Sequence, residues 1–111
     1  MAAFSFFSRR SKSDKIQSLR PSEFRKLITE STIQLVDVRT PEEYNQRKIE
    51  GAQLIDIYDA KFEEIIDGSL DVSIPVCVYC HSGVRSMSAA RILAEKGFTV
   101  YNLRGGMIFW R

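Results

Sequence analysis

Short apolar segments alternate along this chain with segments of helical periodicity. The apolar segments lie at residues 33–38, 52–55, 76–79 and 99–101, and residues 16–19 can add a short edge strand. This alternation is typical of an α/β domain whose strands run mainly parallel. A chain of 111 residues is long enough for one core and too short for two domains. We therefore expect a small single α/β domain with a mainly parallel central sheet flanked by helices.

Capping residues and apolar spacing indicate four helices between these strands. Pro21 suits a first helical turn. Thr40 and Glu43 form a capping box, in which each side chain bonds the backbone N–H of the other. Gly68 and Gly97 are expected to end the third and fourth helices. The first expected helix begins at residue 21 and the second begins directly after residue 40. The third spans residues 60–66 and the fourth spans residues 86–96.

The positive charge of the chain is concentrated near its start. Four basic residues against Asp14 give residues 1–15 a net charge of +3, which leaves −1 for residues 16–111 out of the total of +2. A nucleic-acid partner would need a basic face with interleaved aromatic residues, and residues 16–111 have no such cluster, so we expect no nucleic-acid partner. We predict a flexible basic tail at residues 1–15 and one domain at residues 16–111.

Phe4, Phe6 and Phe7 precede the basic residues of this tail. A secretory signal has the opposite order, with positive charge ahead of a longer apolar run, so the sequence predicts a cytoplasmic location. The alternative role of the tail is membrane contact, in which the phenylalanines enter a membrane surface and the basic residues meet anionic lipid.

Cys80 stands where the strand at residues 76–79 is expected to turn into a helix. A cysteine reacts as its thiolate, and a free thiol titrates at about 8.5, so a reactive cysteine needs stabilisation of the anion. Backbone N–H groups of such a turn, the partial positive charge of the helix start and the Arg85 guanidinium all favour the thiolate. We assign Cys80 as the nucleophile. The substrate-binding loop that follows it consists of His81, Ser82, Gly83, Val84, Arg85 and Ser86.

Cys77 and Cys80 have the C-x-x-C spacing of some redox pairs. Cys77, however, falls within the expected strand, and residues three apart on a strand point to opposite faces. We therefore predict that Cys77 lies in the core. Two cysteines and the single histidine, His81, are too few ligands for a structural zinc site, so no metal is expected.

Five segments occur in an order and at a spacing that can be compared with known families. They are residues 35–44 (LVDVRTPEEY), 48–52 (KIEGA), 80–86 (CHSGVRS), 89–98 (AARILAEKGF) and 102–110 (NLRGGMIFW). Together they resemble the single-domain rhodaneses, a family of sulfurtransferases, over roughly residues 16–111.

The resemblance implies a sulfur transfer in two steps. Cys80 takes a sulfane sulfur from a donor such as thiosulfate or a persulfide and becomes a persulfide itself. It then passes the sulfur to cyanide, a thiol or a protein cysteine. Arg85 is expected to orient an anionic donor, and the loop amides to stabilise the terminal sulfur anion. The implied chemistry requires no external cofactor.

Four further residues are expected to support this site. Asp37 and Arg39 lie at the carboxyl end of an expected strand, where sites form in open α/β sheets, and can hold loops in place through hydrogen bonds and an ion pair. Gly105 and Gly106 resemble the closing turn of the family beside the mouth of its active site, where small residues allow loops to approach closely.

Two alternative functions fit part of this pattern. Cysteine phosphatases and arsenate reductases also place a cysteine before a loop closed by arginine, but the phosphatase pattern has five intervening residues, whereas four separate Cys80 from Arg85. The narrower loop suits a single sulfur atom. A rhodanese-fold sulfur carrier or binding module with little turnover would use the same loop, so this alternative stays open.

Overall fold

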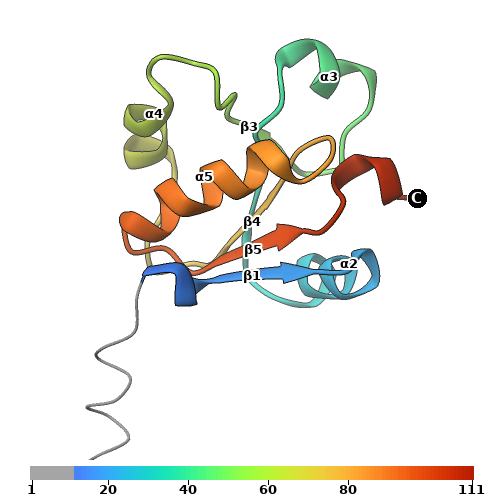
Figure 1. Cartoon of the computed structure of the whole chain (residues 1–111), viewed down its shortest axis with the longest axis horizontal. Coiled ribbons are helices and arrows are strands. Elements are labelled where there is room, and N and C mark those ends of the chain that lie inside the picture. Colours follow the sequence, from blue (N-terminus) through green and yellow to red (C-terminus); the bar gives the residue numbers. More distant parts are fainter. Residues whose placement is uncertain (1–11) are drawn as a thin grey trace, which may run out of the picture.

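Five parallel strands form one sheet in the computed structural model, which describes residues 12–111 (Figure 1). The strand order is β1-β5-β4-β2-β3. The expected parallel sheet is confirmed, and so is the short edge strand, which is β1 beside β5. The strands are β1 (Ile16–Leu19), β2 (Gln34–Asp37), β3 (Gln53–Leu54), β4 (Val76–Tyr79) and β5 (Val100–Leu103).

Helices cover both faces of the sheet (Figure 1). One face packs against the apolar sides of α4 and α5, and the other packs against α2, the residues after α3 and the short helix η2. The helices are η1 (Lys12–Lys15), α2 (Pro21–Glu30), α3 (Pro41–Gln46), α4 (Phe62–Ser69), α5 (Val84–Glu95) and η2 (Gly106–Phe109).

The central strand β4 is buried at all four of its residues, and its side chains alternate between the two faces. Cys77 packs with the core on the α2 face, whereas Cys80 belongs to the core cluster on the α5 face. The prediction that Cys77 lies in the core, away from Cys80, is therefore confirmed. Because parallel strands end at the same edge, Cys80 lies at the middle of the carboxyl edge of the sheet.

Local signals located several helix boundaries, with three differences, one of which is that α4 begins at Phe62 and not at the expected residue 60. The capping box of Thr40 and Glu43 is present at the start of α3, and Gly97 follows α5 with a positive φ of 102°. The prediction that Gly68 ends α4 is wrong, because the helix continues through Gly68 and stops where Leu70 becomes extended. Helix α5 begins two residues earlier than expected, because Gly83 adopts the left-handed conformation and the chain is helical directly after it.

The basic segment at the start of the chain is described only in part. Residues 1–11, which contain the phenylalanines of the alternative membrane-contact role and most of the predicted flexible tail, lie outside the described residues. Residues 12–15 form η1, and Lys15 Nζ donates a hydrogen bond to the Gly97 carbonyl at 3.2 Å. Within residues 12–111, none of the helices has both the length and the apolar character needed to cross a membrane.

Candidate active site

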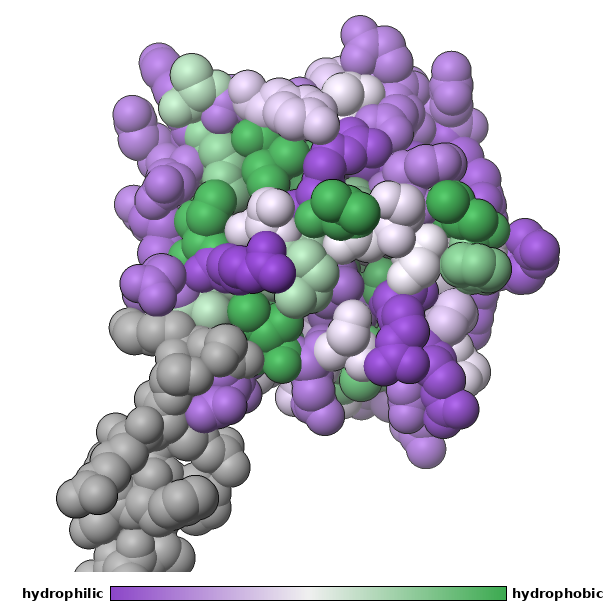
Figure 2. All heavy atoms as spheres, viewed as in Figure 1, coloured by the Kyte–Doolittle hydropathy of each residue, from purple (hydrophilic) through white to green (hydrophobic). Residues whose placement is uncertain are grey.

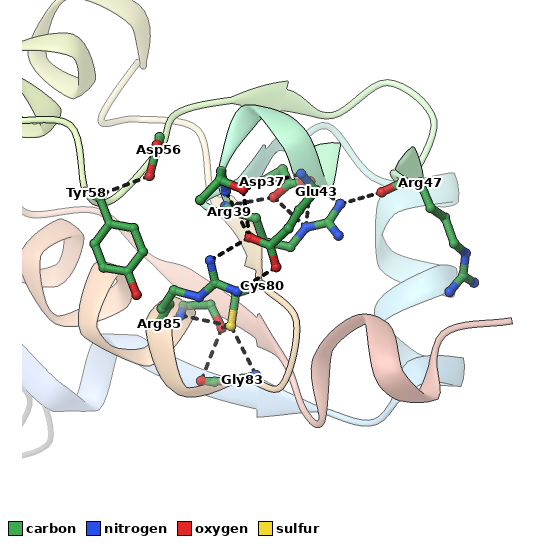
Figure 3. Close-up of polar contacts among 11 residues, drawn as sticks. Asp37, Arg39, Glu43, Arg47, Asp56, Tyr58, Cys80, Gly83 and Arg85 are labelled. Carbon is green, nitrogen blue, oxygen red and sulfur yellow. Dashed lines mark hydrogen bonds and ion pairs between the residues drawn. The ribbon is translucent and has the colours of Figure 1, made fainter. Parts of the chain in front are cut away.

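The Cys80 sulfur lies at the centre of the turn from β4 into α5 (Figure 3). Its Sγ accepts hydrogen bonds from the backbone N–H of Gly83 at 3.0 Å and of Ser86 at 3.2 Å. The positive φ of Gly83, 102°, reverses the chain, and the N–H of Ser86 is one of the first-turn groups that have no partner within a helix. Two main-chain donors therefore converge on one buried sulfur atom, an arrangement suited to a sulfur anion.

A network of hydrogen-bonded polar side chains begins beside this sulfur. Ser86 Oγ lies 3.3 Å from Sγ and donates a hydrogen bond to Asn102 Oδ1 at 2.6 Å. Asn102 Nδ2 in turn donates to Ser18 Oγ at 3.1 Å, so the network crosses from α5 through β5 to β1. The sequence analysis assigned Ser86 to the site but did not assign Asn102. The usable signal was that Asn102 is a polar residue on a mostly buried strand.

Replacing Ser86 with alanine is expected to lower the free energy of unfolding by about 1–3 kcal/mol. The change removes the hydroxyl beside Sγ and leaves the buried Asn102 Oδ1 without its donor. Urea unfolding would measure the loss, with Ser88→Ala as the matched control because Ser88 is exposed on the same helix. Equal effects of the two substitutions would contradict a role for the network.

Arg85 points its guanidinium at a carboxylate of α3 (Figure 3). Its two terminal nitrogens lie 2.7 and 2.8 Å from the two carboxylate oxygens of Glu43. Hydrogen bonds from Arg85 lower the pKa of Glu43 from 4.5 to about 2, and the same bonds raise the pKa of Arg85. The sequence analysis placed Glu43 only in a capping box, a role that it also performs through the Thr40 N–H.

The ion pair between Glu43 and Arg85 predicts a specific pH dependence of stability. The folded-state pKa of Glu43 lies below its ordinary value, so the stabilisation is present above about pH 4.5 and is lost as the pH falls toward 2. We expect the pair to contribute about 1–2 kcal/mol, less than the full shift implies because Glu43 is 30% exposed and solvent screens the pair.

Urea unfolding of the wild type and Glu43→Gln between about pH 7 and pH 2.5 would measure this contribution. The stability difference between the two proteins should shrink as the pH falls. Glu42→Gln is the control, because Glu42 is exposed in the first turn of the same helix. A difference that stays constant with pH would show that the charge of Glu43 adds nothing to stability.

Asp37 and Arg39 form a buried ion pair at the end of β2. Arg39 Nη2 lies 2.7 Å from Asp37 Oδ2, and the same nitrogen donates to the Arg47 carbonyl at 2.5 Å. The pair thus ties the carboxyl end of β2 to the segment after α3 (Figure 3). This is the loop-holding geometry that the sequence analysis expected of the two residues.

The two glycines of the closing turn bring η2 onto the back of the Cys80 loop. Gly105 and Gly106 have positive φ values of 78° and 63°. The N–H of Met107, just after them, donates to the Cys80 carbonyl at 3.0 Å, and the next N–H in the chain donates to the carbonyl of His81 at 3.1 Å. A Cβ on Gly106 would lie 2.4 Å from the His81 oxygen, so the close approach requires glycine at this position.

Three residues of the predicted loop lie on its outer side. The side chains of His81, Ser82 and Val84 are exposed, whereas Cys80 has 0% of its surface exposed. The outer surface around the site is mixed, with separate groups of apolar side chains among polar ones (Figure 2). The hydrogen bonds to Sγ come from Gly83 and Ser86, so the loop surrounds the sulfur with backbone and turns its longer side chains outward.

A surface pocket of about 490 Å³ opens beside the loop. Cys80 itself is fully buried and does not line this pocket. The residues that line the pocket are Arg39, Glu43, Gln46, Arg47, His81, Met107 and Ile108.

Comparison with known proteins decides the family. Residues 20–111 match the family model described as the rhodanese-like domain. The chain belongs to the rhodanese-like domain family. Among curated relatives, the thiosulfate sulfurtransferase GlpE of Pseudomonas paraeruginosa is 35% identical over 102 residues, covering 89% of this chain and 87% of the relative. GlpE of Coxiella burnetii is 36% identical over 86 residues, covering 77% of this chain and 78% of the relative.

Solved structures of similar proteins have the same fold. A rhodanese-like domain protein from Staphylococcus aureus superposes with a TM-score of 0.76 at 30% identity, covering 86% of this chain and 91% of that protein. The polysulfide-sulfur transferase homodimer of Wolinella succinogenes superposes with a TM-score of 0.69 at 30% identity, covering 96% of this chain and 80% of that one. The predicted rhodanese-like α/β fold is therefore confirmed.

Proposed function

We propose that this rhodanese is a sulfurtransferase that carries a sulfane sulfur as a persulfide on Cys80. The observation that carries the proposal is the position of Sγ. It lies inside a strand-to-helix turn and accepts hydrogen bonds from the N–H groups of Gly83 and Ser86. Its GlpE relatives are named thiosulfate sulfurtransferases, which supports the same reaction class.

In the first step the Cys80 thiolate attacks the sulfane sulfur of thiosulfate. A new S–S bond forms on Cys80, the bond between the two sulfur atoms of thiosulfate breaks, and sulfite leaves with the bonding electron pair. In the second step an acceptor thiolate or cyanide attacks the terminal sulfur of the persulfide. The Cys80 thiolate is thereby regenerated, with a persulfide or thiocyanate as the product.

Main-chain donors suit both forms of the cysteine. The N–H groups of Gly83 and Ser86 stabilise the thiolate before the attack, and the first turn of α5 adds the positive end of its helix dipole. After the attack the negative charge lies on the outer sulfur of the persulfide, one bond beyond Cys80 Sγ. The first-turn N–H groups of Val84 and Arg85, which have no partner within the helix, can then stabilise it.

Intact-mass measurement after incubation with thiosulfate tests this function. We expect the protein to gain the mass of one sulfur atom and to lose it when cyanide is added, with thiocyanate released. A chromogenic phosphate ester tests the phosphatase alternative in parallel. Hydrolysis of the ester without any sulfur gain would reject the sulfurtransferase proposal in favour of a phosphatase.

The same experiment addresses the carrier alternative. Formation of the persulfide with negligible cyanide turnover would identify a sulfur carrier or binding module. We propose thiosulfate or a persulfide as the donor, and cyanide, a thiol or a protein cysteine as the acceptor. We propose a cytoplasmic location for the reaction.

A further inference from the structure

The positive charge of Arg85, which interacts with Cys80, is already paired with a carboxylate of the protein. Arg85 is close enough to Cys80 for the two groups to interact electrostatically, and Figure 3 shows the two side chains together at the loop. Both terminal nitrogens of Arg85 are engaged by the carboxylate of Glu43, at 2.7 and 2.8 Å. This bidentate arrangement is the one that an oxyanion from solution would otherwise adopt with the guanidinium.

The two arginines that line the pocket, Arg39 and Arg47, likewise have partners within the protein. Arg39 binds Asp37 and the carbonyl of Arg47. The side chain of Arg47 donates to the carbonyl of Met107 at 3.3 Å and to that of Trp110. Within residues 12–111, the guanidinium groups of Arg39, Arg47 and Arg85 therefore all donate hydrogen bonds to other groups of the protein. An anion that enters the pocket therefore meets guanidinium groups that already have partners within the protein.

The two classes of sulfur donor differ in how much they need such a charge. Thiosulfate presents its sulfane sulfur to Sγ while its sulfonate group, part of a dianion, remains on the outer side of the loop, where Arg85 and the carboxylate of Glu43 lie. The carboxylate repels the dianion and competes with it for the guanidinium. A persulfide with an uncharged tail is affected less, because its departing thiolate carries one negative charge, whereas thiosulfate places a doubly charged group beside Glu43.

We propose that Glu43 is a specificity-determining residue, which holds Arg85 in an ion pair beside Cys80 and so favours persulfide donors over thiosulfate. The inference rests on the proposed sulfurtransferase function and refines its substrate class. In the favoured reaction the Cys80 thiolate attacks the outer sulfur of the donor persulfide. The S–S bond of the donor breaks, the donor thiolate leaves with the electron pair, and the new S–S bond is on Cys80.

Single-turnover sulfur loading, followed by intact mass, tests the proposal with two donors. The probes are thiosulfate and freshly prepared N-acetylcysteamine persulfide, whose tail is uncharged. In Glu43→Gln we expect the ratio of the thiosulfate rate to the persulfide rate to rise about tenfold, since the carboxylate charge is removed from a partly screened pair. Glu42→Gln, which changes an exposed neighbour on the same turn, should leave the ratio as in the wild type.

A double variant separates donor selection from a structural effect. If Glu43 acts by occupying Arg85, the gain in the thiosulfate ratio should disappear when Arg85→Gln is added to Glu43→Gln. A purely structural role would slow both donors equally and leave the ratio unchanged, which would overturn the inference. Glu43→Ala provides a second charge-removing variant, with thermal unfolding to verify that each protein is folded.

Failure of this inference is distinguishable from failure of the proposed function. If the wild type gains no sulfur from either donor, the sulfurtransferase proposal fails. If the wild type is loaded by both donors but the donor ratio is the same in Glu43→Gln, only the role of Glu43 in donor selection is rejected.

Discussion

Cys80→Ser is expected to abolish sulfur loading, lowering the rate of thiocyanate formation from thiosulfate and cyanide more than about a thousandfold. A serine hydroxyl at this position can still accept hydrogen bonds from the N–H groups of Gly83 and Ser86, so the loop should keep its conformation. The substitution removes the atom that forms the persulfide. Intact mass after thiosulfate treatment, together with a colorimetric thiocyanate assay, would measure both losses.

Cys77→Ala is the matched control for this substitution. Cys77 is fully buried on the opposite side of the sheet, and burial raises the pKa of its thiol to about 12, so it remains protonated at neutral pH. We expect this variant to load sulfur as the wild type does, with a stability loss of about 1 kcal/mol from the small cavity. Cyanide-removable sulfur that persists in Cys80→Ser, or that is lost in Cys77→Ala, would show that the nucleophile is not Cys80.

Gly106→Ala is expected to destabilise the protein by about 3–5 kcal/mol and to slow sulfur loading. The new Cβ would lie 2.4 Å from the His81 oxygen and 2.6 Å from the Cys80 oxygen, and the φ of 63° adds strain for any residue with a Cβ. To relieve the contact, η2 must move away from the loop. The hydrogen bond from the Met107 N–H to the Cys80 carbonyl would then be lost.

Gly68→Ala is the matched control for the closing turn. Gly68 lies within α4 and does not have a positive φ, and a Cβ added to it would have no other atom within 4 Å beyond its immediate helical surroundings. We expect the substitution to leave stability unchanged or to raise it by about 0.5–1 kcal/mol, because alanine favours a helix. Urea unfolding measures both variants, and equal stability of Gly106→Ala and the wild type would refute the close contact at the loop.

The wrong prediction at Gly68 shows the limit of local signals. A glycine near the end of an apolar helical pattern is a common helix stop, but here the helix continues to Ser69, and the N–H of Leu70 still bonds the Ile66 carbonyl. Gly97 carried the same signal and does follow the end of α5 with a positive φ. Tertiary packing of the flanking residues, which the local pattern does not contain, decides between such cases.

The sequence by itself determined the features that depend on neighbouring residues. The alternation of strands and helices, the capping box of Thr40 and Glu43, and the turn at Gly83 that points N–H groups at Cys80 all follow from short-range geometry and periodicity. Residues a few positions apart have few conformations available, so their pattern is informative without knowledge of the fold.

Only the tertiary structure decided which distant side chains complete the site. Glu43 reaches Arg85 across 42 residues of chain, and Ser86 on helix α5 contacts Asn102 on strand β5. The carboxylate of Glu43 takes the place at Arg85 that was expected for an anionic donor. The burial of Cys80 and the seating of η2 on its loop are also long-range. These contacts depend on how separate elements pack around one sheet, a spatial relation that no local spacing of residues encodes.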